Sequence, residues 1–239
     1  MDYKKRIGTL RGKMEERGLS GMFVGADASW EYLSGAKRIG RDKTCQRQNS
    51  LEYACLLVTE KDVVLFVPRL TGLGILPFLP ENNAVTKQVV YPDEDLTGET
   101  FFKTVRELGL SDKEVGVNRD ITATETLCLQ NRLGCRVTEA SDLIDGMRAV
   151  KDSEEIALMR KNSAIADQVY QDIMPMVRPG AMVREIEYEI EKLFEKYGCS
   201  MPSFPAEAIV LGPASGPVFG MNYDRVEKGY SFAFDFGGV

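Results

Sequence analysis

The sequence predicts an α/β protein in two parts: a mixed-sheet α/β domain over residues 1–146, followed by an α+β unit over residues 147–239. Short apolar runs alternate with amphipathic segments along the first part, which is typical of a sheet covered by helices. A helix-start signal at Asp152 follows the last of these elements. Two amphipathic segments and two further apolar runs come after it, so a second packed unit is expected there.

The first part opens with an amphipathic helix over residues 3–18. Ile7, Leu10 and Met14 recur at the spacing of one helix face, and Gly18 is a residue type that ends helices. The remaining elements are expected in this order: strand 21–25, hairpin strands 53–59 and 62–68, strand 85–91, helix 101–108, strand 115–117, helix 122–133, strand 135–137 and helix 141–150.

The second part is expected to begin with a long helix. Asp152 and Glu155 have the spacing of a capping box, in which each side chain accepts a hydrogen bond from the other residue's backbone N–H. The helix should run to about Met174, because Pro179 and Gly180 interrupt the chain soon afterwards.

A second helix is expected over residues 182–197, with an apolar stripe on one face. Its glutamates alternate with other residues and are predicted to be exposed to solvent; they are Glu185, Glu187, Glu189 and Glu191. Two β-like runs follow at residues 208–211 and 231–236, separated by a loop rich in glycine and proline.

Composition excludes several classes of function. The 239 residues are 44% hydrophobic and 28% charged, and 30 basic against 36 acidic residues give a net charge of −6. This balance argues against a nucleic-acid or acidic-membrane partner.

Apolar runs are far shorter than the roughly 20 residues of a membrane span, and the N-terminus lacks the apolar core of a signal peptide. Five cysteines without a Cys-x-x-Cys motif indicate neither a disulfide framework nor a zinc knuckle, so the cytoplasm is the expected location.

The sequence contains no histidine. This excludes a Ser-His-Asp triad, a Cys-His dyad and any histidine-ligated metal within these residues.

Several short motifs, in a fixed order, resemble those of the creatinase/aminopeptidase P/prolidase family, whose catalytic domain has the pita-bread fold. Residues 31–35 (EYLSG) resemble the Y-L-(S/T)-G of its N-terminal domain, and residues 147–156 (MRAVKDSEEI) resemble the R-x-x-K opening of its catalytic domain. The segments 177–180 (VRPG), 211–213 (LGP) and 227–237 (EKGYSFAFDFG) follow in the family's order. The resemblance implies a creatinase-type N-terminal domain, then the first part of an α+β pita-bread domain.

The resemblance also implies a metal centre. Active peptidases of this family hold two divalent ions, of Mn, Co, Zn or Fe, with two Asp, one His and two Glu. The first Asp lies in the D-x-G segment, which places Asp235 as a metal ligand, and the other four ligands would fall beyond Val239. We therefore expect no bound metal for this chain alone. Without the resemblance, Asp235 before Gly237 and Gly238 reads rather as a strand-end cap or a turn residue.

The chain departs from the family's pattern in one loop. Active relatives carry a histidine there that assists at the substrate carbonyl, and the matching position holds Val218. Asn222 or Tyr223 could donate a hydrogen bond from the same loop, or both could be ordinary exposed residues. In the N-terminal domain, Arg38 and Arg41 follow the Y-L-S-G motif; they could meet a substrate carboxylate across a dimer, or form a solvated basic cluster.

Two functional hypotheses follow from the resemblance. The first is a Xaa-Pro-type metallopeptidase, or a fragment of one, that acts on small peptides as a homodimer and is inactive as the 239-residue chain. The second is a divergent member of the same fold: a creatinase-like C–N hydrolase, a lyase or a non-catalytic binding protein. The absent histidine favours the second hypothesis, and Asp235 favours the first.

Overall fold

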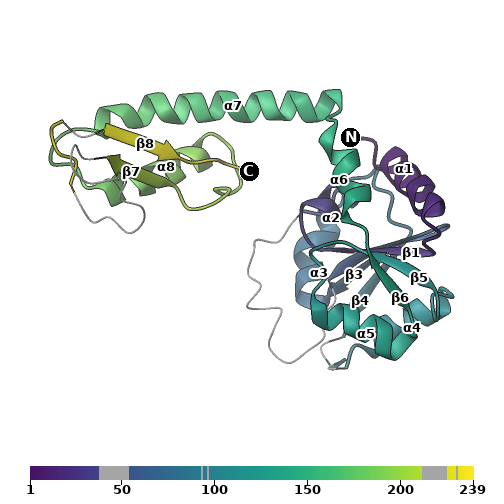
Figure 1. The fold of residues 1–239 in the computed structure, drawn as a ribbon. Helices are drawn as coiled ribbons and strands as arrows, with labels where there is room; N and C mark the ends of the chain where they lie inside the picture. The colour runs from purple at the N-terminus through teal and green to yellow at the C-terminus, as the bar shows by residue number, and fades with distance from the viewer. Residues whose placement is uncertain (38–53, 93, 96, 212–224, 230) are drawn as a thin grey trace. The chain divides into compact units, whose positions relative to one another are not determined.

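The computed structural model describes residues 1–37, 54–92, 94, 95, 97–211, 225–229 and 231–239. The chain folds into two compact units, Met1–Val150 and Lys151–Val239, each with its own hydrophobic core (Figure 1). No helix in the described part of the chain is long and apolar enough to cross a membrane.

A six-stranded mixed sheet forms the centre of the first unit, with the strand order β4-β3-β2-β1-β5-β6. Only β2 runs antiparallel to its neighbours β1 and β3, and the other neighbouring strands are parallel. The predicted mixed-sheet α/β domain is therefore confirmed. The strands are β1 (Gly21–Gly25), β2 (Cys55–Thr59), β3 (Val63–Pro68), β4 (Lys87–Tyr91), β5 (Glu114–Val117) and β6 (Arg136–Glu139).

Helices cover both faces of this sheet (Figure 1). In β1, Met22 and Val24 point into the core under α1, α2 and α6, whereas Phe23 points into the core under α4 and α5. This alternation is the period of two expected of a strand buried on both faces. The helices are α1 (Tyr3–Glu16), α2 (Ala28–Ser34), α3 (Arg69–Ile75), the short 3₁₀ helix η2 (Leu76–Phe78), α4 (Glu99–Glu107), α5 (Ala123–Leu133) and α6 (Ser141–Ala149).

The second unit consists of helices packed on a two-stranded antiparallel sheet. The predicted capping box is confirmed: Asp152 accepts the Glu155 N–H at 2.8 Å, and Glu155 accepts the Asp152 N–H at 2.9 Å. The elements are α7 (Ser153–Ile173), the 3₁₀ helix η3 (Met174–Met176), α8 (Val183–Lys196), β7 (Glu207–Leu211) and β8 (Ser231–Asp235).

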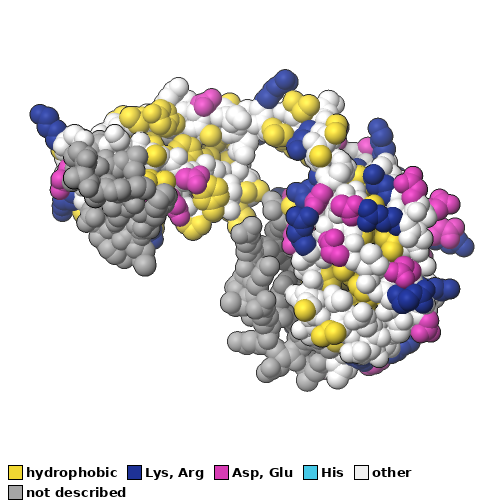
Figure 2. Space-filling model, in the orientation of Figure 1, with side chains coloured by type: hydrophobic (Ala, Val, Ile, Leu, Met, Phe, Trp, Pro, Cys, Tyr) yellow, Lys and Arg dark blue, Asp and Glu magenta, His cyan; other side chains and the backbone are white. Residues whose placement is uncertain are grey.

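Apolar side chains remain at the surface of the second unit, and they gather on the face that Figure 2 shows. Val169 and Ile173 in the last turns of α7 are buried, but large apolar residues nearer its N-terminus are not. The exposed large apolar residues of this helix are Ile156, Leu158 and Met159 near its N-terminus, and Tyr170 beside Val169.

One prediction for α8 is wrong. Glu187 is not a solvated residue but is 8% exposed, with its carboxylate between β7 and the helix. Residues 187 and 191 lie one turn apart on the same helix face, so the alternation along the sequence does not describe the exposure of either.

Candidate functional site

Asp235 is the last residue of β8, and its side chain is exposed. Along this strand Ser231, Ala233 and Asp235 are exposed, whereas Phe232 and Phe234 pack against the helices. Because side chains alternate between the faces of a strand, the Asp235 carboxylate lies on the face of the sheet opposite α7 and α8.

The chain immediately after Asp235 is tightly held. The Phe236 ring packs in the core 5.6 Å from that of Phe194. A Cβ atom on Gly237 would lie 2.7 Å from Ser203 Oγ, and one on Gly238 would lie 2.5 Å from Phe194 Cδ1. The Ser203 hydroxyl can rotate away from a side chain at position 237, but the Phe194 ring and the Cys199 side chain leave no room at position 238, so Gly238 is the position that requires glycine.

Two glutamates of α8 hold the partner strand. The Ala208 N–H donates to Glu187 Oε1 at 3.0 Å, and the Ala206 N–H donates to Glu191 Oε1 at 3.2 Å. These N–H groups point away from β8, so the two carboxylates cover the outer edge of β7. Sequence reasoning missed this role, although the spacing of four residues between the two glutamates was its visible signal.

A second carboxylate lies beside Asp235, on the neighbouring strand and the same face of the sheet. Glu207 is its direct partner in the β7–β8 register, and both side chains are exposed. Cross-strand partners lie on the same face of a sheet, about 4.5–5.5 Å apart at Cβ. Within the described residues no three Asp, Glu, Cys or His side chains converge as a metal site. With no imidazole in the sequence, these donors do not fit a complete two-metal centre, and we assign no chemical step to one.

The other predicted site residues lie outside the described part of the chain: Val218, Asn222, Tyr223, Arg38 and Arg41. The structure therefore places Asp235 and brings it together with Glu207, which sequence reasoning did not select.

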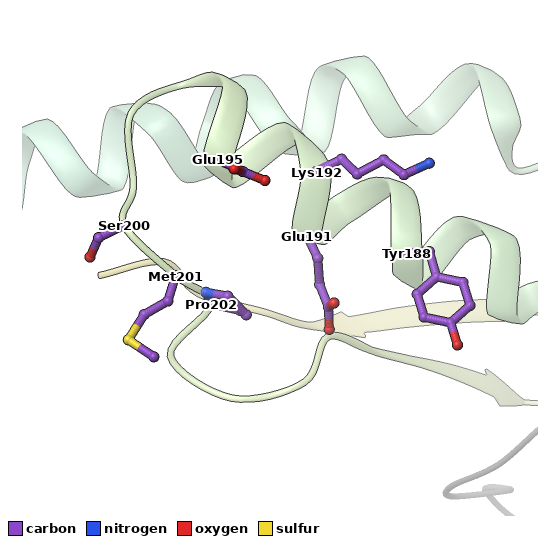
Figure 3. A pocket seen from close by; sticks show the side chains of 7 residues that line it. All are labelled: Tyr188, Glu191, Lys192, Glu195, Ser200, Met201 and Pro202. Carbon is purple, nitrogen blue, oxygen red and sulfur yellow. The ribbon is translucent and has the colours of Figure 1, made fainter. Parts of the chain in front are cut away.

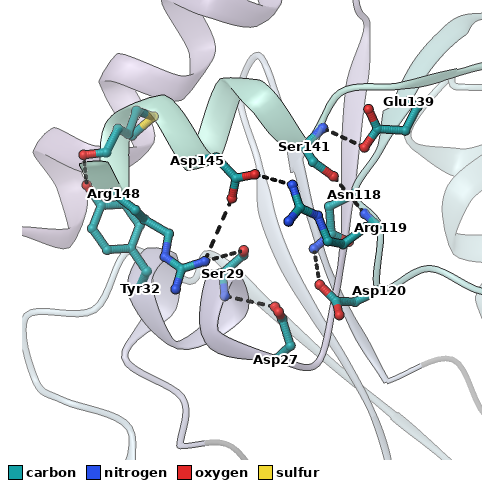
Figure 4. Close-up of polar contacts among 11 residues, drawn as sticks. Asp27, Ser29, Tyr32, Asn118, Arg119, Asp120, Glu139, Ser141, Asp145 and Arg148 are labelled. Atoms are coloured by element: carbon teal, nitrogen blue, oxygen red, sulfur yellow. Dashed lines mark hydrogen bonds and ion pairs between the residues drawn. The ribbon is translucent and has the colours of Figure 1, made fainter. Parts of the chain in front are cut away.

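The ends of β1 and β5 form a second candidate ligand site. The two strands are adjacent and parallel, and the helices that follow them, α2 and α5, pack on opposite faces of the sheet. Ligands of α/β proteins commonly bind where neighbouring strands diverge in this way. Polar side chains occupy this edge (Figure 4). Asn118 Oδ1 accepts the Gly25 N–H at 2.8 Å, and its Nδ2 donates to Asp120 at 3.0 Å. A Cβ on Gly25 would lie 2.8 Å from Asp120 Cβ, so the turn after β5 packs directly against the end of β1.

A network of ion pairs continues from this turn to α6 (Figure 4). The Arg119 guanidinium binds Asp145, and the Arg119 N–H donates to Ser141 Oγ at 2.8 Å. Arg148 lies 3.9 Å from Asp145 and donates to Ser29 Oγ at 3.4 Å. These contacts join α6 to the start of α2, so the arginine of the R-x-x-K segment has a structural role in the first unit.

Each of the two units matches the model of a known protein family. Residues 6–150 match the model of the creatinase/prolidase N-terminal domain, and residues 157–239 match that of metallopeptidase family M24. The chain belongs to the creatinase/prolidase family. The resemblance inferred from the short motifs is thereby confirmed.

Relatives within the creatinase/prolidase family are distant in sequence. The Xaa-Pro dipeptidase of Pyrococcus furiosus is 21% identical over 238 residues, 99% of this chain and 61% of that protein. An uncharacterized peptidase of Staphylococcus epidermidis is 21% identical over 187 residues, 78% of this chain and 51% of the relative. The chain thus spans between one half and about three fifths of these relatives' length.

Solved structures show the same fold. The prolidase of Thermococcus sibiricus superposes with a TM-score of 0.80 at 21% identity, over 100% of this chain and 62% of that one. The prolidase of Pyrococcus horikoshii gives a TM-score of 0.78 at 18% identity, over 98% and 60% of the two chains. The predicted pita-bread architecture of the second part is therefore confirmed at the level of fold.

Proposed function

We propose that this chain is part of a Xaa-Pro-type metallopeptidase, similar to aminopeptidase P and prolidase, that cleaves small peptides with a divalent ion of Mn, Co, Zn or Fe. One observation carries the proposal: Asp235 stands exposed at the end of β8, within the segment that matches metallopeptidase family M24. Its carboxylate is an oxygen donor of the kind these ions accept.

The chain's own residues would contribute only part of such a centre. Asp235 would bind one ion directly, and the close packing of Gly238 against Phe194 would hold the following backbone in place. Bound metal supplies Lewis acidity and an activated water in this class of hydrolase. Because the sequence has no histidine, the 239-residue chain alone is expected not to hydrolyse Xaa-Pro dipeptides or creatine.

Val218 supports a second candidate function. A valine cannot donate a hydrogen bond where active relatives carry a histidine, and loss of one such donor commonly reduces rates about 10²–10³-fold. A divergent creatinase-like C–N hydrolase, a lyase or a non-catalytic binding protein would tolerate this change better than an ordinary peptidase.

Sequencing the coding region downstream of the Val239 codon, together with an assay of the translated product, separates these candidates. The peptidase proposal expects in-frame Asp, His and two Glu codons, and Mn- or Co-dependent cleavage of a Xaa-Pro dipeptide that Asp235→Asn abolishes. A full product that carries these ligands yet shows no metal-dependent cleavage would favour the divergent member. A product without them that binds no Mn would exclude the peptidase.

We further propose a cytoplasmic homodimer, in which the basic segment around Arg38 and Arg41 faces the substrate of the neighbouring subunit. The exposed apolar side chains of α7 support burial against further protein. Sedimentation equilibrium at several concentrations tests this, and a stable monomer at every concentration would refute it.

A further inference from the structure

A groove runs along the second unit between α8 and the loop that leads to β7 (Figure 3). Its volume is about 440 Å³, which lies in the range of small-ligand sites. The helix contributes Tyr188 and the residues three, four and seven positions after it, which places all four on one helix face. The lining residues are Tyr188, Glu191, Lys192, Glu195, Ser200, Met201 and Pro202.

The loop wall of this groove is fixed by its own hydrogen bonds. The Ser200 N–H donates to the Val239 carbonyl at 2.6 Å, and the Val239 N–H donates to the Met201 carbonyl at 2.9 Å. A further bridge pairs Pro202 with Gly238. Because the loop is tied to the last residues of the chain, the groove is formed before any ligand arrives, which lowers the cost of binding.

The two carboxylates in the groove, Glu191 and Glu195, are only partly hydrogen-bonded within the described part of the chain. Glu191 uses Oε1 to accept the Ala206 N–H, which leaves Oε2 without a described donor. The Glu195 side chain makes no hydrogen bond or ion pair within the described part of the chain. The one cation of the lining, Lys192, is paired with Glu189 at 3.2 Å. Two carboxylates one helical turn apart are therefore available to a cation.

Apolar groups flank these carboxylates. Tyr188 is 51% exposed and Met201 is 43% exposed, and in Figure 3 they stand at opposite ends of the groove, on either side of the Glu191 side chain. The Tyr188 ring already contacts a guanidinium, since Arg184 Cζ lies 4.6 Å from its centroid. A side chain with an aliphatic stem and a planar cationic head would satisfy both kinds of surface.

We propose that this groove is a docking site for an arginine side chain of a partner protein. The stem would lie against Met201 and Pro202, and the guanidinium would bridge Glu191 and Glu195. Arginine fits better than lysine, because its planar fork can bond two carboxylates at once and stack on an aromatic ring. The assignment is independent of Asp235, which lies on the opposite face of the sheet from the helices.

The test is an NMR titration of the 239-residue chain with methyl-labelled methionine. The probe is the capped peptide acetyl-Gly-Arg-Gly-amide, and Met201→Leu identifies the reporting methyl signal. Parallel titrations use peptides in which lysine or the neutral isostere citrulline replaces arginine. The E191Q/E195Q variant removes both charges, while the amide oxygen introduced at position 191 can still accept the Ala206 N–H. Glu60→Gln in the β2–β3 turn is the matched control.

We expect a saturable shift of the Met201 methyl signal with the arginine peptide and a smaller response to lysine and to citrulline. The double variant should bind the arginine peptide roughly three- to tenfold more weakly, and the Glu60→Gln control should be unchanged. An absent shift, an equal shift with citrulline, or undiminished binding by the double variant would overturn the site. An equal response to lysine would overturn the assignment to arginine.

Discussion

Asn118 joins the ends of β1 and β5, and its removal provides a sharp test of how the first unit is held together. The residue is 3% exposed, and its side chain accepts the buried Gly25 N–H at 2.8 Å. Its amide nitrogen donates to Asp120 at 3.0 Å. Asn118→Ala removes both bonds, whereas Asn118→Asp keeps the acceptor and replaces the donor by a second carboxylate oxygen.

The expected cost follows from these contacts. A buried N–H left without an acceptor costs about 1–3 kcal/mol, and the lost bond to Asp120 adds about 1 kcal/mol, so Asn118→Ala should lower the free energy of unfolding by about 3 kcal/mol. Asn118→Asp places two carboxylates within hydrogen-bonding distance, which raises the pKa of one of them in the folded state. This pair then binds more protons in the folded state than in the unfolded chain, so the destabilisation of Asn118→Asp relative to the wild type should be smaller near pH 4.5 than near pH 7.5.

The assay is urea unfolding followed by tryptophan fluorescence. Trp30 is the sequence's one tryptophan and is fully buried in α2, so it reports the first unit alone. With a urea dependence of about 2 kcal/mol/M, a loss of about 3 kcal/mol moves the midpoint down by about 1.5 M. Asn82→Ala, at an exposed asparagine, is the control and should shift it little. A midpoint for Asn118→Ala equal to that of the control would refute the reasoning.

Three further changes have defined outcomes. Gly238→Ala would place a Cβ 2.5 Å from a ring carbon on α8, and should destabilise the second unit by about 1–3 kcal/mol in thermal unfolding followed by circular dichroism. Glu187→Ala should cost that unit about 1–3 kcal/mol by leaving the Ala208 N–H unpaired, whereas Glu187→Gln should cost less; equal effects would contradict this. Hydrogen bonds from Arg17 lower the pKa of Asp142, so Asp142→Asn should be less stable than the wild type at pH 7, and this difference should shrink as the pH falls from about 3.9 through the lowered folded pKa, measured by urea unfolding at each pH.

The first unit was largely predictable because its signals are local and repeated. The face formed by Ile7, Leu10 and Met14 is buried as its spacing indicated, and the strands lie where short apolar runs predicted them. Two helices were not predicted, α2 and α3, each of seven residues. Two turns are too few for an apolar period to show, and tertiary packing decides such segments.

The second unit was less predictable where a charge is buried. Helix spacing places Glu187, unlike its exposed neighbour Glu185, on the same face as the buried Val183 and Ile190, but it does not show what a carboxylate there would bind. The difference arises from β7, which brings the Ala208 N–H to one face of α8 only. Sequence spacing shows which residues share a helix face, but the position of a partner strand about twenty residues away is a tertiary fact.

For Asp235, the sequence motif identified the residue and the structure shows its surroundings. Asp235 ends a strand, the Phe236 ring packs in the core, and Gly238 lies too close to Phe194 to carry a side chain. The same structure adds Glu207 on the same face, a residue that no motif marked. Two adjacent carboxylates repel each other unless a cation relieves them. Asp235→Asn is therefore expected to raise the stability of the second unit without added metal, measured by thermal unfolding, because it removes this repulsion; an unchanged or lower stability would contradict the reasoning.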